Sequence, residues 1–334
     1  MLLPKTYRKL VARRLSPHFQ EAAEIVEVPT PRPGPGELLI RNRFAGVNAT
    51  DVNITAGRYR PAMTPPFDLG AEAVGEVVAV GEGVRDFRPG DPVGTIKLGG
   101  GYAEYQIVPA KHAIPVPEVS AEVVSLLVSG LTASISLQEV ARIRAGEKVL
   151  VTAAAGGTGQ YAVQLARMAG CTVIGTCGSE EKAALLRELG CDRVINYREE
   201  DVARVLREEF PDGVDVVYES VGGELFDLCL EALARHGRLL CIGFISEYLT
   251  GPQPVARPRI YARLIPKSAS VHGFFLPHFV AHFRTHLPRL FQLYRSGKLR
   301  VAVDPTPFEG LESVADAVEH LHAGRNVGKV VVRL

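Results

Sequence analysis

The sequence predicts an α/β fold in which a β-barrel-like domain precedes a doubly wound parallel sheet. Between residues 9 and 116, short strand-like runs are separated by turns rich in Gly and Pro, which is typical of a barrel of short strands. From residue 148 onward, strand-like and helix-like segments alternate, which indicates parallel strands joined by crossover helices. The 334 residues are enough for two domains of ordinary size.

The expected elements follow these two patterns along the chain. In the first region, strands are expected at 37–44, 73–80 and 103–108. In the second region, strands are expected at 148–153, 172–176, 193–195, 214–218 and 238–242, with helices at 160–168, 180–188, 202–209 and 224–234. A helix at 310–323 and a terminal strand at 329–333 are expected to return to the first domain. The predicted division is therefore 1–128, 129–270 and a tail, 271–334.

The amino-acid composition limits the classes of protein to which this chain can belong. Hydrophobic residues make up 46% of the chain, which predicts a substantial core. The 38 Lys and Arg residues nearly balance the 37 Asp and Glu residues, so neither nucleic acid nor a membrane is expected as a partner. The five cysteines form no C-x-x-C pair and predict buried reduced thiols. No secretory signal and no apolar run long enough to span a bilayer is recognised, so a cytoplasmic protein acting on a small molecule is expected.

A glycine-rich turn marks the start of the second region. The strand KVLVTA runs into AAGGTG, which places Gly156, Gly157 and Gly159 before a helix, with Ala154 where a first glycine is usual. Such a turn lets a pyrophosphate approach the backbone at the helix N-terminus. It can also serve packing alone. Its position before successive strand–helix units favours a dinucleotide site in a Rossmann domain.

The end of the second strand bears on the choice of dinucleotide. NAD sites usually carry an acidic residue there, whereas this strand continues into Gly178 and Ser179 without a carboxylate. Lys182 follows three residues after Ser179, so its ammonium and the Ser179 hydroxyl could bind the 2′-phosphate of NADPH. Alternatively, Lys182 is an ordinary surface residue at an exposed helix N-terminus. We expect NADPH as the cofactor.

Five motifs connect the chain to a known family: GVNATD, GAEAVGEVVAVGEGV, GDPV, GLTA and NVGKVVV. In this order, they resemble the quinone oxidoreductase branch of the medium-chain dehydrogenases/reductases, and the resemblance covers nearly the whole chain. It implies a GroES-like domain and a Rossmann domain, with substrate and nicotinamide in the cleft between them. A homodimer is also expected.

The resemblance implies a set of cofactor-binding residues, most of them in the Rossmann domain. These are Thr132, Gly156, Gly157, Thr158, Gly159, Ser179, Lys182, Tyr197, Ser220, Ile242, Tyr248, Phe274, Phe275, Leu276 and Asn326. Gly178 departs from this pattern, because the closer relatives carry what looks like a serine there. One donor to the 2′-phosphate is therefore expected to be missing.

No catalytic metal is expected. Zinc alcohol dehydrogenases of this superfamily carry their ligands at the positions of Asn48, Ala71 and Val128, and none of these three side chains binds zinc well.

Three histidines also have a spacing relevant to metals. His278, His282 and His286 recur every four residues, so one helix would place all three near one face. Metal binding there is one interpretation. The other is a partly exposed helix edge, which is favoured because the spacing stacks the imidazoles along the axis and no carboxylate completes an H-E-x-x-H pattern.

The expected reaction is NADPH-dependent, zinc-independent reduction of the C=C bond of an α,β-unsaturated ketone, of the 2-alkenone or 15-oxo-prostaglandin type. Tyr248, in GFISEY, is the expected donor to the enolate oxygen, although it could instead only pack against the ribose. Asn48 and Tyr59 are expected to orient substrate, and Asp51 to act as a structural cap. The alternatives are an NADPH:quinone oxidoreductase and a non-catalytic NADPH-binding protein.

Overall fold

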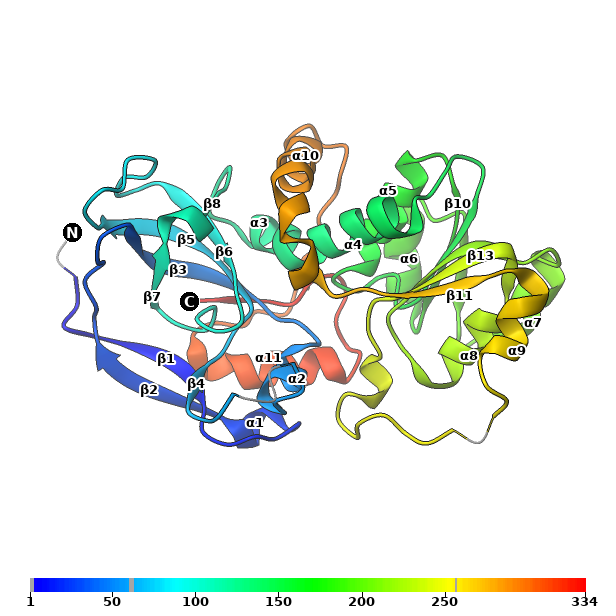
Figure 1. Cartoon of the computed structure of the whole chain (residues 1–334), viewed down its shortest axis with the longest axis horizontal. Coiled ribbons are helices and arrows are strands. Elements are labelled where there is room, and N and C mark those ends of the chain that lie inside the picture. The colour runs from blue at the N-terminus through cyan, green and yellow to red at the C-terminus, as the bar shows by residue number, and fades with distance from the viewer. Residues whose placement is uncertain (1–2, 60–62, 256) are drawn as a thin grey trace. The chain divides into compact units, whose positions relative to one another are not determined.

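The chain divides into two compact units (Figure 1). The structure, a computed structural model, describes residues 3–59, 63–255 and 257–334. Unit 1 runs to Val128 and resumes at Val303, and unit 2 is Ser129–Ala302. The strand and the helix that follow residue 269 pack with unit 2, so this unit continues to residue 302.

Unit 1 contains two antiparallel sheets, as expected for a GroES-like domain. One has the strand order β2-β1-β4, and the other has the order β15-β3-β5-β6-β8, with β7 also paired to β3. The strands are β1 (Thr6–Ala12), β2 (Ala23–Pro29), β3 (Glu37–Gly46), β4 (Phe67–Asp68), β5 (Glu72–Val80), β6 (Pro92–Ile96), β7 (Tyr105–Pro109), β8 (Ile114–Pro115) and β15 (Val331–Arg333). The helices are α1 (Phe19–Ala22), α2 (Asp51–Thr55), η1 (Ala110–His112), α3 (Ala121–Ser125), η7 (Leu311–Ser313) and α11 (Val314–His322).

Strand β3 is the centre of the larger sheet. It pairs with β5, β7 and β15, and its Leu38 and Ile40 are fully buried against Val77, Val93 and Val108. Alternating apolar side chains on neighbouring strands thus form one core. The C-terminal strand returns to β3 in antiparallel register, which confirms the predicted course of the tail.

Unit 2 is a parallel sheet in the order β11-β10-β9-β12-β13-β14, which confirms the doubly wound prediction. Its strands are β9 (Lys148–Val151), β10 (Thr172–Cys177), β11 (Arg193–Asn196), β12 (Val214–Glu219), β13 (Leu233–Cys241) and β14 (Ser270–Gly273). The longer helices are α5 (Gly159–Met168), α6 (Glu180–Glu188), α7 (Val202–Glu209), α8 (Gly223–Glu231) and α10 (Phe283–Arg295). The shorter ones are α4 (Leu131–Ile135), η3 (Ser136–Ala141), η4 (Ile245–Glu247), α9 (Tyr261–Leu264), η5 (Ile265–Lys267) and η6 (Leu276–His282).

The topology of unit 2 fixes where a ligand can bind. The strand order reverses between β9 and β12, and open α/β sheets bind ligands at the carboxyl ends of the strands beside such a reversal. One element differs from the sequence prediction. The helix expected to reach residue 234 ends at Glu231, because Leu233 is already buried in the core and pairs with Val214 of β12.

A helical stretch over Ala121–Ala141 was not predicted from the sequence. It comprises α3, η2 (Leu126–Gly130), α4 and η3. Within the described part of the chain, it alone is long and apolar enough to cross a membrane, contrary to the expectation that no run reaches that length. However, 78% of its most apolar window is buried in the protein, which is the behaviour of a core helix.

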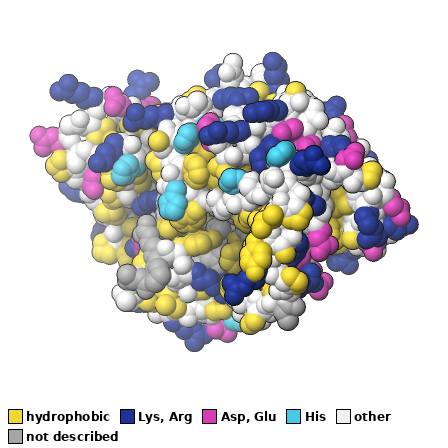
Figure 2. Space-filling view, turned by 45° about the vertical axis from the view of Figure 1, so that its right-hand side comes forward, with side chains coloured by type: hydrophobic (Ala, Val, Ile, Leu, Met, Phe, Trp, Pro, Cys, Tyr) yellow, Lys and Arg dark blue, Asp and Glu magenta, His cyan; other side chains and the backbone are white. Residues whose placement is uncertain are grey.

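Charged side chains of both signs are visible on one face of the molecule (Figure 2). On the face drawn in Figure 2, Lys and Arg side chains are distributed among Asp and Glu side chains. This distribution accompanies a formal net charge of only +1.

Candidate functional site

The glycine-rich turn lies between β9 and α5, at the reversal of strand order. α5 begins at Gly159, and a Cβ atom on this residue would lie 2.7 Å from Ala154 Cα. Only glycine therefore lets the helix start so close to the preceding backbone. Gly156, Gly157 and Thr158 complete the turn before the helix N-terminus, where backbone N–H groups suit an anion such as a pyrophosphate.

Ala154 replaces the usual first glycine without disturbing this turn. Its backbone N–H donates to the carbonyl oxygen of Thr176 at 3.0 Å, which joins the turn to the end of β10. On β10, a Cβ atom at Gly175 would lie only 3.0 Å from the Ala154 methyl group. The methyl group at position 154 is therefore accommodated because Gly175 has no side chain.

Glu219 holds the loops on both sides of the reversal together. Its Oε1 accepts hydrogen bonds from the Val221 backbone at 2.7 Å and from the Thr152 hydroxyl at 3.3 Å. The Thr152 hydroxyl in turn accepts a bond from the Ser220 backbone at 2.9 Å. Burial raises the pKa of Glu219, while these donors act against that rise. Glu219 was not predicted from the sequence, because its bond to Thr152, which directly follows β9, joins residues 67 positions apart.

Two buried hydroxyl groups near the carboxyl ends of the strands have no hydrogen-bond partner in the described structure. They are Thr176 Oγ1 on β10 and Ser220 Oγ directly after β12. An unpaired buried hydroxyl costs free energy, so both positions fit a site completed by a polar ligand. Ser220 was predicted as a cofactor-binding residue, whereas Thr176 was not.

The residues predicted to bind a 2′-phosphate are gathered at the ends of β10 and β11. The Ser179 hydroxyl caps α6 by accepting a bond from the Lys182 backbone at 3.3 Å. Tyr197 follows β11, and its backbone N–H donates to Cys177 at 3.0 Å. A Cβ atom on Gly178 would collide with the Tyr197 ring. The tyrosine thus fills the space that a serine side chain at 178 would need.

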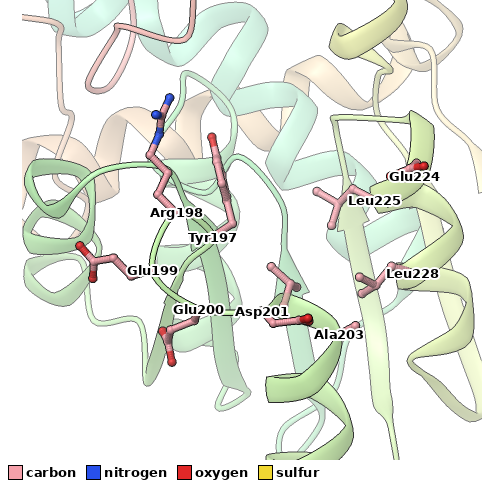
Figure 3. Close-up of a pocket in the computed structure, with 10 residues that line it drawn as sticks. Tyr197, Arg198, Glu199, Glu200, Asp201, Ala203, Glu224, Leu225 and Leu228 are labelled. Carbon is pink, nitrogen blue, oxygen red and sulfur yellow. The ribbon is translucent and has the colours of Figure 1, made fainter.

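A pocket opens beside Tyr197, at the carboxyl ends of β11 and β12 (Figure 3). Its lining includes Tyr197, Arg198, Asp201, Glu224, Leu225 and Leu228. Figure 3 shows the side chains of Tyr197 and Arg198 extending to the same side of the loop. Arg198 is exposed and adds a second cation close to Tyr197. Arg198 was not predicted as a cofactor-binding residue from the sequence, although it directly follows the predicted Tyr197.

The remaining predicted cofactor residues of unit 2 follow later strands. The Ile242 backbone donates to Glu219 at 2.7 Å, which places it beside Ser220, and the Phe274 backbone donates to Cys241 at 3.0 Å. The other predicted residues are Phe275 and Leu276, which lie on the segment after β14, and Thr132, which lies on α4. Asn326 belongs to unit 1, where its amide donates to the Gly328 carbonyl at 2.9 Å.

Tyr248 lies at the end of η4, in the loop after β13. Its side chain is only 2% exposed, and its hydroxyl accepts a long hydrogen bond from the Phe244 backbone at 3.4 Å. The two rings meet edge to face, with centroids 4.6 Å apart. This loop is therefore held near the carboxyl end of β13 by an aromatic contact and a weak bond.

In unit 1, the residues at the expected metal-ligand positions surround a buried ion pair rather than a set of metal ligands. Lys329 Nζ lies 2.7 Å from both Glu72 Oε1 and Asn48 Oδ1, and the Asn48 amide donates to Glu72 at 2.9 Å. The second Glu72 oxygen accepts a bond from the Val128 backbone at 2.7 Å. Ala71 contributes only a methyl group. This set of donors does not fit zinc, which prefers thiolate, imidazole and carboxylate ligands around one point.

Asp51 and Tyr59 also have partners within unit 1. Asp51 Oδ2 accepts bonds from the Asn48 backbone at 2.9 Å and from the Tyr102 hydroxyl at 2.6 Å, so it closes the turn before α2. The predicted capping role is wrong, because Thr50 is the N-cap residue of α2 and Asp51 is the first residue inside the helix. Burial raises the pKa of Asp51 to about 6. The Tyr59 hydroxyl accepts a bond from the Asn53 amide at 3.1 Å. Substrate orientation by Asn48 and Tyr59 stays a prediction.

The three histidines do not share one regular helix. Phe279 has non-helical backbone angles (φ −113°, ψ 20°) inside η6, so the predicted continuous helix is wrong at this position. The distortion separates His278, whose ring packs against Phe275 at 5.2 Å, from His282 and His286.

Comparisons with known proteins agree with this architecture. Residues 34–118 match the alcohol dehydrogenase GroES-like domain, and residues 157–292 match the zinc-binding dehydrogenase family. Prostaglandin reductase-3 of Mus musculus is 52% identical over 99% of this chain and 90% of its own length. A probable quinone oxidoreductase of Leishmania amazonensis is 46% identical over 100% of both chains.

A solved structure gives the same result for the fold. Escherichia coli quinone oxidoreductase complexed with NADPH superposes with a TM-score of 0.85 at 29% identity, covering 98% of this chain and 100% of that one. The antiparallel sheets of unit 1, the dinucleotide-type turn of unit 2 and these relatives lead to one assignment. The chain belongs to the medium-chain dehydrogenase/reductase superfamily, in its quinone oxidoreductase branch.

Proposed function

We propose that this protein is an NADPH-dependent reductase of α,β-unsaturated ketones, of the 2-alkenone or 15-oxo-prostaglandin type, and that it works without zinc. Two relatives are named as a prostaglandin reductase and as a probable quinone oxidoreductase, which supports an oxidoreductase activity for this protein. The main observation in favour of a zinc-free reaction is that Asn48, at one of the positions where zinc enzymes of this superfamily carry a ligand, binds Lys329, which also pairs with Glu72.

The preference for NADPH rests on the end of β10. Ser179, Lys182 and Tyr197 form a polar and cationic group there, and no carboxylate competes with a phosphate at positions 177–179. Arg198 adds a second positive charge. A phosphate dianion is stabilised by charge-assisted hydrogen bonds of this kind, whereas a ribose hydroxyl gains little from them.

The proposed reaction needs few groups from the protein. NADPH, when bound, supplies the hydride. Addition of hydride at the β-carbon breaks the C=C π bond and moves an electron pair to the carbonyl oxygen, and water then supplies the proton at the α-carbon. Tyr248 is proposed to donate a hydrogen bond to that oxygen, which the long bond that its hydroxyl accepts from the Phe244 backbone does not prevent. Such a bond is stronger to the enolate than to the ketone.

The test is a comparison of substrates with identified products. Purified protein is mixed with NADPH and a 2-alkenone, a 15-oxo-prostaglandin or a quinone, and oxidation of NADPH is followed together with mass spectrometry of the product. Formation of the saturated ketone supports the proposal. Reduction of the quinone alone would assign an NADPH:quinone oxidoreductase, and cofactor binding without turnover of any compound would assign a non-catalytic NADPH-binding protein.

A further inference from the structure

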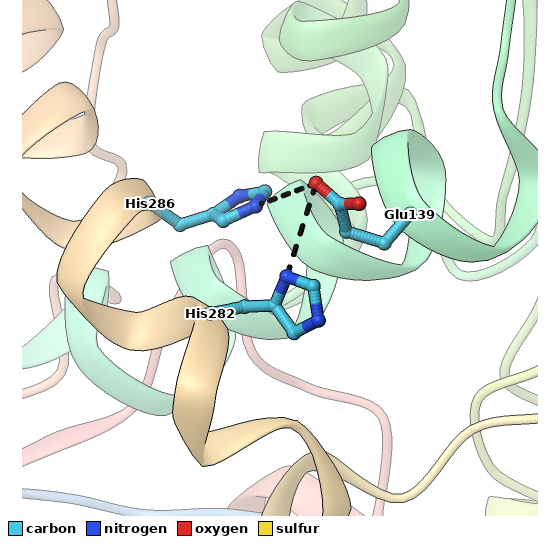
Figure 4. A group of neighbouring side chains, drawn as sticks. All are labelled: Glu139, His282 and His286. Atoms are coloured by element: carbon cyan, nitrogen blue, oxygen red, sulfur yellow. Dashed lines mark hydrogen bonds and ion pairs between the residues drawn. The ribbon is translucent and has the colours of Figure 1, made fainter.

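Glu139, His282 and His286 form a three-residue cluster within unit 2 that the proposed reaction does not use (Figure 4). Glu139 lies on η3, and the two histidines lie at the end of η6 and in α10. Figure 4 shows both imidazole rings turned toward the same carboxylate. The carboxylate that the sequence analysis did not find beside the histidines is therefore supplied by a helix more than one hundred residues earlier.

The distances within the cluster approach those of a metal site. His286 Nε2 lies 3.1 Å from Glu139 Oε1, and His282 Nδ1 lies 4.0 Å from the same oxygen. One ligand atom from each residue lies within 4.8 Å of the others. Tetrahedral zinc with bonds of about 2.0–2.1 Å separates its ligand atoms by roughly 3.3 Å. The partly exposed His282 ring has to move inward by up to about 1.5 Å to reach this geometry.

A second contact orients the buried member of the cluster. His286 is 2% exposed, and its Nδ1 lies 2.7 Å from the Ser134 hydroxyl on α4. When Nδ1 carries the proton and donates it to Ser134, the lone pair of Nε2 faces Glu139. Metal-binding histidines commonly have such a partner on their other ring nitrogen, because it fixes the tautomer and the ring orientation.

The position of His278 shows that this histidine does not belong to the cluster. On the same segment, His278 packs against Phe275, and the distorted backbone at Phe279 lies between it and the other two histidines. His282 and His286 keep the four-residue spacing that places two imidazoles on one face of a helix. His278 is therefore a matched control on the same surface.

We propose that Glu139, His282 and His286 bind one Zn²⁺ ion, with water as the fourth ligand. Two imidazoles and one carboxylate are ligands that zinc accepts readily and that magnesium does not favour. The ion replaces the proton between His286 and Glu139 and connects η3 to α10. Zinc at this site stabilises unit 2 and takes no part in hydride transfer, since none of its three ligands belongs to the predicted catalytic set.

Calorimetric titration of the untagged, chelator-treated full chain with ZnCl₂ tests the proposal. The expected result is one zinc ion per chain, no comparable heat with MgCl₂, and a melting temperature that rises with zinc concentration. The His282→Ala and Glu139→Gln variants should each weaken zinc binding by more than about 100-fold, and Ser134→Ala by roughly 10–100-fold. His278→Ala should bind zinc as the unchanged protein does.

The controls separate loss of the site from loss of the fold. His282 and Glu139 are both about 40% exposed, so their variants should keep the circular dichroism spectrum and the zinc-free melting temperature of the parent protein. Equal zinc affinity in the parent protein, His282→Ala and Glu139→Gln would overturn the proposal. Absence of saturable zinc binding in the parent protein would also overturn it, and a larger loss in His278→Ala would assign the metal elsewhere.

Discussion

Lys329 Nζ lies 2.7 Å from Glu72 Oε1, and the two side chains are only 2% and 0% exposed. Residues 257 positions apart in the chain thus form a buried ion pair, which also binds the Asn48 amide oxygen. Removing one partner would leave an uncompensated charge in the core of unit 1, because neither group can reach water.

Lys329→Met should therefore destabilise unit 1 by about 3–5 kcal/mol. Adding Glu72→Gln in the same chain removes the unpaired carboxylate and should restore part of this loss. Denaturant unfolding of the two variants and the parent protein measures both effects. If the double variant were less stable than Lys329→Met, the carboxylate of Glu72 would not be the source of the destabilisation.

Asp51 predicts a dependence of stability on pH. Its pKa is about 6 in the folded protein and 3.8 in its ordinary state, because burial disfavours the charged form. The folded protein holds this proton more tightly, so the stabilising contribution is complete below about pH 4 and is lost as the pH rises through about 6. Relative to Asp51→Asn, which does not titrate, the parent protein should lose about 1–3 kcal/mol between these limits.

Unfolding free energies of both proteins at several pH values between about 4 and 7.5 would measure this difference. A difference that does not change with pH would show that Asp51 has the same pKa in both states. A parent protein that gains stability over Asp51→Asn as the pH rises would mean that the hydrogen bonds from Tyr102 and Asn48 outweigh burial.

Lys182→Ala should weaken NADPH binding about tenfold or more, since one charge-assisted contact contributes roughly 1.5–3 kcal/mol. NADH binding should hardly change, because NADH has no 2′-phosphate. Fluorescence titration with each cofactor gives the two dissociation constants. Equal losses for NADPH and NADH would contradict the assignment of Lys182 to the phosphate.

Tyr248→Phe keeps the ring that packs on Phe244 and removes only the hydroxyl. If this hydroxyl stabilises the enolate, kcat for a 2-alkenone should fall about tenfold or more, equivalent to about 1–4 kcal/mol, with little change in NADPH affinity. Steady-state kinetics with an enone and a quinone would separate the roles, since a quinone accepts hydride more readily. An unchanged kcat for the enone would leave Tyr248 as a packing residue.

Removal of metal should leave the reductase activity intact. Asn48, Ala71 and Val128 offer zinc no suitable set of ligands, so chelator-treated protein should keep its kcat for an enone. Elemental analysis before and after treatment shows whether zinc was removed. Activity lost with zinc and restored by ZnCl₂ in the Glu139→Gln variant would place a catalytic ion outside the histidine cluster.

The alternation of strands and helices in unit 2 could be predicted from the sequence because it depends on local periodicity. Helices α6 and α7 begin and end at the predicted residues, and both start with a side-chain cap, Ser179 or Asp201. The glycine-rich turn could also be predicted from the sequence, since Gly159 is required where the helix begins close to the preceding backbone. Patterns within about ten residues decided these features.

Contacts between distant residues required the tertiary structure. The sequence showed Gly178 as the loss of a serine, whereas the fold places the ring of Tyr197 in that space. It showed histidines without a carboxylate, whereas the packing of η3 beside α10 brings Glu139 to His286. No local pattern encodes such pairs, because their free energy depends on the packing of whole elements, and a single distorted residue such as Phe279 decides which side chains meet.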